Sequence, residues 1–187
     1  MHTLKILLIS LLSFSLLTGF SFGKKDPDEK RAEIDQAVGE VLSKLYHEEP
    51  SAENLLEQSA GYAVFSSIGV NVMVLSTANG KGVVVRKNGD RVYMKMYSAG
   101  VGIGMGIKDF RLIFVFDDDE VMDTFIEEGW TAGAQADAAA THDDEGDAAT
   151  LAIDVSPGVR LFQLTESGLA LQATIQGTRY LKDDDLN

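Results

Sequence analysis

Five of the 16 basic residues of this chain lie in one short stretch, and the chemistry they offer is the binding of anions. Residues 81–95 contain a single acid, Asp90, and five bases: Lys81, Arg86, Lys87, Arg91 and Lys95. The whole chain has a formal net charge of −13. Because salt screens charges over about 8–10 Å, a local basic patch can still attract an anion to an acidic protein. The stretch therefore predicts a local surface that can bind an anion, and the alternative is a hairpin kept soluble by its charged face.

A second pattern places glycine at every other position of the segment SAGVGIGMGIK, at Gly100, Gly102, Gly104 and Gly106. A dinucleotide-binding loop needs G-x-G-x-x-G, but Met105 or Ile107 stands where the third glycine is required. A period of two is that of a β-strand, which puts all four glycines on one bare face. Three explanations stay open: close packing of a helix or sheet corner, a flat groove where an acyl chain or another ligand lies against the backbone, or a tight bend in a barrel-like sheet.

No set of residues in the sequence has the spacing of a catalytic site. His47 and His142 are far apart, and the chain has no G-x-S-x-G motif, no Walker loop and no cysteine. The acidic stretch at residues 142–147 could hold a divalent cation, but it lacks the spacing of a calcium loop. Solvated acids are the favoured interpretation there. We therefore predict that the protein is not an enzyme and uses no cofactor or metal.

The first 23 residues have the pattern of a secretory signal peptide. Lys5 precedes a run of apolar and small residues that ends at Gly23, directly before the charged Lys24. We expect cleavage near Gly23, and the alternative is an uncleaved anchor. The location that follows is the bacterial envelope, periplasmic or secreted. The acidic remainder of the chain speaks against nucleic acid as a partner.

Residues 24–59 have the signals of two helices. Asp26 and Pro27 form a helix start, and apolar residues then recur at helical spacing, at Ile34, Val38, Val41, Leu42 and Leu45. The opposite face mixes acids and bases, whereas a helix lying on a membrane would be basic there. We expect this helix to pack on its own domain, followed by a short second helix that ends near Ser59.

The strongest strand signal is the segment GVVVRKNGDRVYMKM, where Asn88 and Gly89 favour a two-residue hairpin turn. That turn would pair Arg86 with Arg91 and Val84 with Tyr93. One face of the hairpin would then be the core side, with Val83, Val85, Val92 and Met94. The other face would gather Arg86, Arg91, Lys95 and Tyr93.

The rest of the chain continues with strands and one more helix. The sequence predicts a strand that ends before Asp117, a helix over residues 120–132 with Trp130 on its apolar side, and further strands from VRLFQLT to TRYL. There is no regular alternation of strand and helix. This order favours a single α+β domain, with N-terminal helices packed on a curled, largely antiparallel sheet.

Four phrases, in order, resemble a known family. They are GYAVFSS, VYMKMYSAGVGIGMGIKDFRLIFVF, the pair Gly129-Trp130 and LTESGLALQATIQGTRYLKDDDLN. Together they resemble the bacterial branch of the SYLF domain family, over residues 60–187. The resemblance implies a non-enzymatic module that binds phospholipids, with anionic headgroups as ligands in its eukaryotic relatives. Those relatives carry SH3 or FYVE domains, and some bundle actin, which we do not expect of an exported bacterial protein.

Basic residues carry the lipid contacts in the eukaryotic relatives, and here the bases of residues 81–95 are the ones placed to do so. We therefore expect an exported module that binds phospholipid peripherally at a membrane surface. Its headgroup contacts would come from Lys81, Arg86, Lys87, Arg91 and Lys95. The alternative is a structural domain of the envelope that binds a protein partner and has no lipid specificity.

Overall fold

A computed structural model describes residues 26–72, 75–101, 109–132, 152–165, 168–170 and 178–187. Its helices are α1 (Pro27–Glu48), α2 (Ser51–Gln58) and α3 (Asp119–Glu127). Its strands are β1 (Gly61–Val72), β2 (Leu75–Arg86), β3 (Arg91–Val101), β4 (Asp109–Phe116), β5 (Trp130–Ala132), β6 (Ile153–Ser156), β7 (Val159–Thr165), β8 (Gly168–Ala170) and β9 (Thr178–Lys182). The α+β class expected from the sequence is confirmed.

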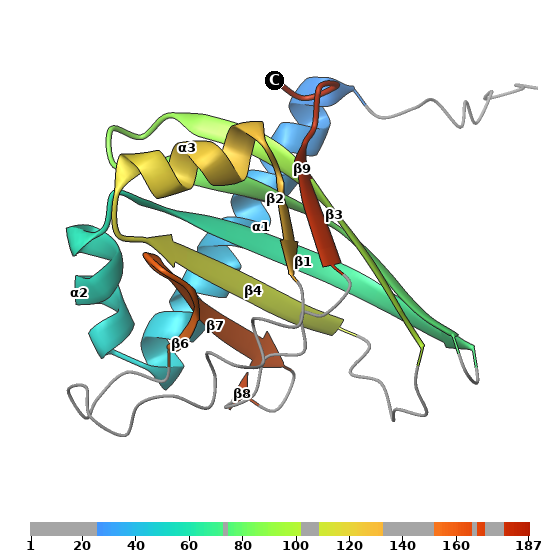
Figure 1. The fold of residues 1–187 in the computed structure, drawn as a ribbon, viewed down its shortest axis with the longest axis horizontal. Coiled ribbons are helices and arrows are strands. Elements are labelled where there is room, and N and C mark those ends of the chain that lie inside the picture. The colour runs from blue at the N-terminus through green and yellow to red at the C-terminus, as the bar shows by residue number, and fades with distance from the viewer. Residues whose placement is uncertain (1–25, 73–74, 102–108, 133–151, 166–167, 171–177) are drawn as a thin grey trace, which may run out of the picture.

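All strands belong to one antiparallel sheet in the order β5-β9-β3-β2-β1-β4-β7-β6, with β8 paired to β7. The sheet is curled, and α3 lies over one face while α1 runs behind the other (Figure 1). The long strands β1, β2 and β3 form the middle of the sheet and extend beyond both helices (Figure 1). The expected arrangement of N-terminal helices on a curled sheet is therefore present.

Helix α1 begins as its sequence predicts. The Asp26 side chain accepts a hydrogen bond from the Asp28 backbone N–H, and Pro27 takes the first helical position. Four of the five apolar residues that share its inner face are buried against the sheet: Ile34, Val38, Val41 and Leu45. The mixed outer face thus accompanies packing within the domain, as expected.

The β2–β3 hairpin differs from the predicted one by a single residue. Its turn runs from Arg86 to Asp90, with the Arg86 N–H donating to the Asp90 carbonyl and the Gly89 N–H donating to the Arg86 carbonyl. Gly89 has φ +91°, a conformation that suits glycine. The register is therefore Val85 opposite Arg91, and the expected pairing of Arg86 with Arg91 is wrong.

Because side chains alternate along a strand, this shift changes the face on which several residues lie. Val83, Val85 and Tyr93 face α1, in a core shared with Ile113 and Phe162. Val84, Met94 and Met96 face α3, in the second core. The predicted grouping of Val83, Val85, Val92 and Met94 on one core side is wrong, because the observed register places Val92 and Met94 on the α3 face, opposite Val83 and Val85.

The end of α3 also differs from the prediction. The helix ends at Glu127, and Gly129 has φ +71°, so Trp130 lies in strand β5 and not in the helix. Trp130 still packs on the core under α3. No helix within the described ranges is long and apolar enough to cross a membrane.

Candidate functional site

A cleft of about 550 Å³ lies between α1 and the sheet. Helix α1 contributes one wall, and strands β1, β2 and β3 contribute the floor. The lining is mostly apolar, with charged side chains at three positions. It consists of Glu33, Ile34, Ala37, Val38, Val41, Val64, Ser66, Gly80, Lys81, Lys95, Met96 and Tyr97.

The cleft lies where the α1 face of the sheet changes from apolar to polar. Val64, Val83 and Tyr93 are register partners across β1, β2 and β3, and all three are buried. Two residues away on each strand, toward the same end of the sheet, the partners on this face are Ser66, Lys81 and Lys95. The strands therefore carry an apolar row under the helix, followed by a row with two adjacent cations.

Lys95 is tied to the C-terminal end of the chain. Its Nζ lies 2.7 Å from Oδ1 of Asp183, whose side chain is only 4% exposed, and 3.5 Å from Oδ2 of Asp185. The hydrogen bond to Asp183 raises the pKa of Lys95 above its usual value, and the Asp185 charge adds to the effect. Lys95 is thus a cation at the cleft that already has an anionic partner.

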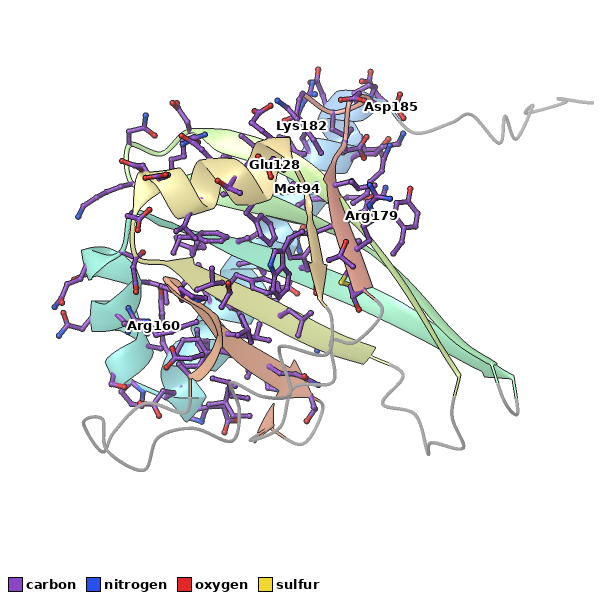
Figure 2. All side chains as sticks on the ribbon, viewed as in Figure 1. Met94, Glu128, Arg160, Arg179, Lys182 and Asp185 are labelled. Carbon is purple, nitrogen blue, oxygen red and sulfur yellow. The ribbon has the colours of Figure 1, made fainter. Side chains whose placement is uncertain are left out.

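Hydrogen bonds and a buried leucine hold this C-terminal tail, residues 183–187, in place. The Asp183 N–H and Asn187 Nδ2 both donate to the Tyr93 carbonyl, at 2.9 and 2.8 Å, and the Tyr93 N–H donates to Asn187 Oδ1 at 2.9 Å. Arg31 of α1 donates to the Leu186 carbonyl at 2.8 Å, and the Leu186 side chain is buried. The tail therefore extends the edge of β3 next to the N-terminal half of α1, where Figure 2 shows Asp185.

Lys81 differs from Lys95 in having no such partner. Its side chain is exposed, and its ammonium group makes no ion pair or hydrogen bond within the described residues. Lys81 and Lys95 lie directly opposite each other on β2 and β3. An anion at this end of the cleft would therefore meet one uncommitted cation and one that is shared with the tail.

The remaining bases of the hairpin lie elsewhere. Arg86 pairs with Asp123 of α3 at 2.5 Å, on the α3 face, whereas Arg91 pairs with Asp35 of α1 at 2.6 Å. Lys87 is exposed in the turn. The expectation that Arg86 shares a face with Arg91 and Lys95 is wrong, because the register of the hairpin places it on the opposite side of the sheet.

Tyr93 belongs to the same α1-facing surface as Arg91. Its hydroxyl donates to Asp35 Oδ2 at 3.1 Å, so Asp35 joins Tyr93 and Arg91 to the helix. Burial raises the pKa of Tyr93, and the neighbouring Asp35 carboxylate raises it further. This network fixes α1 to the sheet beside the cleft.

Other predicted features fall partly or wholly outside the described residues. Gly100 lies in β3, opposite Ser76, but Gly102, Gly104 and Gly106 lie outside, as do the signal-peptide segment and the acidic stretch at residues 142–147. Within the described ranges, no group of three His, Cys, Asp or Glu residues could hold a metal ion.

Sequence reasoning missed the contributions of α1 and of the tail to this site. In the sequence, nothing distinguishes Ala37 from the other alanines of the helix. Its place in the cleft follows only from the packing of α1 on the sheet. The acidic run Asp183-Asp184-Asp185 could have indicated the role of the tail. Any of these acids that is buried in the fold needs a cationic partner. The sequence did not indicate which base that partner would be.

Comparison with known proteins gives one informative match. No family model matches the chain. The chain is 36% identical over 163 residues to a protein named Beta cell expansion factor A, from Aeromonas veronii. The match covers 87% of this chain and 60% of that protein, so the chain spans less than two thirds of its relative. The two proteins are homologous over most of the present chain.

Proposed function

We propose that this protein is an exported, non-enzymatic module of the SYLF type that binds phospholipids at a membrane surface. The observation that carries the proposal is the pair of cross-strand lysines, Lys81 and Lys95, at an apolar cleft in an otherwise acidic protein. Cations next to apolar surface suit a ligand that joins an anionic group to hydrocarbon. The homologue named as an expansion factor for beta cells supports a protein that acts outside the bacterium.

The structure narrows the set of bases that would contact headgroups. Arg86 and Arg91 are each committed to a carboxylate on a neighbouring helix, and Lys95 is committed to the tail. Lys81 and Lys87 are exposed and have no ion pair within the described part of the chain. We therefore assign the main headgroup contact to Lys81, with Lys95 beside it, and a weaker surface contact to Lys87.

Sedimentation with vesicles tests this function directly. The purified protein is spun with vesicles of neutral phospholipid and with vesicles containing anionic phospholipid, at low and high salt. We expect pelleting with anionic vesicles that weakens at high salt, because exposed charges are screened over about 8–10 Å at physiological ionic strength. Lys81→Gln should reduce pelleting more than Lys30→Gln, which makes the same charge change on α1 outside the cleft lining.

Two results would reject the proposal. Absence of pelleting with either kind of vesicle would favour the alternative, an envelope domain that binds a protein partner. Equal effects of Lys81→Gln and Lys30→Gln would show that the overall charge matters and that the cleft surface has no special role.

A further inference from the structure

We propose that the cleft under α1 takes a single acyl chain of a lipid, with its anionic group held by Lys81 at the cleft mouth. This inference rests on the proposed function and names the part of the lipid that the site accepts. It differs from surface adhesion, in which headgroups alone would touch the protein and the hydrocarbon would stay in the membrane.

The walls of the cleft suit hydrocarbon. Ile34, Val38 and Val41 come from one face of α1, and Val64 comes from β1 below them. The stretch of helix from Ile34 to Val41 is about 10 Å long, so the apolar wall is extended along the helix axis. A volume of about 550 Å³ lies within the range of small-molecule sites, about 300–1,000 Å³. An empty apolar cleft of this size gains dispersion contacts when a hydrocarbon chain fills it.

Small residues keep this space open. Ala37 lies on the helix wall between the larger apolar residues, and Ser66 lies on β1. A larger side chain at position 37 would project into the cleft and not into the closed core.

The charges around the cleft favour one negative group on the ligand. The lining has two lysines and one acid, Glu33, whereas the whole chain has an excess of 13 negative charges. The charge of Lys95 is already balanced by Asp183 and Asp185. Lys81 is thus the cation available to a ligand, and the tail acids would repel a second anionic group.

The mouth of the cleft has the features of a lipid entrance. Lys81 of β2 and Tyr97 of β3 line the cleft, and the strands β1, β2 and β3 extend beyond α1 (Figure 1). Tyr97 is 47% exposed and is the large hydrophobic side chain most open to solvent among the described residues. An aromatic ring with a polar tip suits a boundary between water and hydrocarbon. A chain entering here would pass Tyr97 and Lys81 before reaching the valines.

Binding of monomeric amphiphiles tests the inference without a membrane. The purified protein is titrated calorimetrically with dodecanoate and with dodecyltrimethylammonium, which has the same chain length and the opposite charge, both kept below micelle formation. We expect saturable binding of one dodecanoate per protein and weaker binding of the cation. Ala37→Phe should weaken dodecanoate binding about tenfold or more, because the ring occupies the space of the chain.

Matched variants separate filling of the cleft from damage to the fold. Ala32→Phe makes the same change at an exposed position of α1 outside the cleft and should bind like the unmodified protein. Lys81→Met should fold normally, weaken dodecanoate binding about two- to fivefold, and remove the preference over the cationic amphiphile. Unchanged dodecanoate binding by both Ala37→Phe and Lys81→Met would overturn the inference.

The outcome is separable from that of the proposed function. Vesicle binding that Ala37→Phe leaves intact, together with no dodecanoate binding, would reject the acyl-chain site and leave surface binding standing. Dodecanoate binding by a protein that does not sediment with vesicles would support the acyl-chain site and reject membrane association.

Discussion

The two faces of the sheet are built differently. On the α3 face, aromatic rings close the core: the Phe65 and Tyr180 centroids are 4.8 Å apart, and Phe114 lies 5.1 Å from Tyr180 and 5.5 Å from Trp130. On the α1 face, the fully buried side chains of the helix are aliphatic, Tyr46 packs against them partly buried, and a cleft of about 550 Å³ remains between helix and sheet.

The difference assigns separate tasks to the two faces. Close-packed rings bury much apolar surface and supply stability, but they leave no room for a ligand. The α1 face holds its helix partly through polar links, such as those from Asp35 to Arg91 and Tyr93. With the acyl-chain site proposed above, the α3 face would be the stabilising half of the domain and the α1 face the binding half.

The largest expected effect comes from opening the aromatic face. Phe114→Ala removes a fully buried ring that contacts four others, and it should lower the free energy of unfolding by about 3–5 kcal/mol. Ile34→Ala, beside the existing cleft, should cost about 2 kcal/mol, at the low end for such a change, because it adds to space already open. Denaturant unfolding measures both, and equal losses would contradict the division between the faces.

The next largest effect concerns the ion pair at the cleft. Lys95→Met leaves the buried Asp183 carboxylate without its cation and should lower the free energy of unfolding by about 1–3 kcal/mol at neutral pH. Asp183→Asn in the same background should recover part of the loss, since an amide is cheaper to bury than an unpaired charge. A Lys95→Met protein as stable as the original would show that the tail does not depend on this pair.

The same pair predicts the behaviour in alkali. The raised pKa of Lys95 means that the folded state keeps a proton that the unfolded state releases near pH 10.4. The pair's contribution is therefore fully present below about pH 10.4 and is lost as the pH rises through the raised pKa. Unfolding followed between pH 8 and about pH 11 should show falling stability, with a shallower fall in Lys95→Met.

A smaller effect, of opposite sign, is expected at the centre of the aromatic face. The Tyr180 hydroxyl is buried and has no hydrogen-bond partner within the described residues, and burial raises its pKa far above the usual value. Tyr180→Phe should raise the free energy of unfolding by about 1 kcal/mol at neutral pH, because it removes an unsatisfied polar group. It should also reduce the loss of stability above about pH 10, where an unfolded tyrosine ionises. A loss of stability on this change would reveal a partner for the hydroxyl.

The smallest effect is expected on the outer surface of α1. Gly39 is exposed inside the helix, and a Cβ added there would meet nothing within 4 Å. Gly39→Ala should therefore raise the free energy of unfolding by about 0.5–1 kcal/mol through helix propensity alone. Thermal unfolding checks the gain, and dodecanoate binding should stay the same. A change in binding would mean that the flexibility of α1 contributes to the cleft.

Local signals account for what could be predicted of the fold. The cap at Asp26, Pro27 and the apolar spacing of α1 act within a few turns of one helix, and the structure confirms each. The predicted register of the hairpin was wrong because Asn88-Gly89 is compatible with a longer turn as well as with a two-residue turn. The three consecutive valines at 83–85 did not reveal the error, since a sheet covered on both faces buries all of them.

The candidate site could likewise be predicted only in part from the sequence. The clustering of Lys81 and Lys95 with the other bases is a property of the sequence, and the structure does bring these two together. The division of the five bases between two faces depends on register, where a slip of one residue moves every side chain to the other side. No residue near the turn indicates which of the two registers the hairpin adopts.

The sequence by itself determined the helix starts, the class of the fold and the presence of a basic segment in an acidic chain, because these depend on residues close together along the chain. Only the tertiary structure decided that Lys95 is bound by Asp183, that Arg86 turns to α3, and that α1 stands over a cleft. These features join segments tens of residues apart, and they depend on how two layers pack on one sheet. Packing of that kind is a property of the assembled core, which no single stretch of sequence contains.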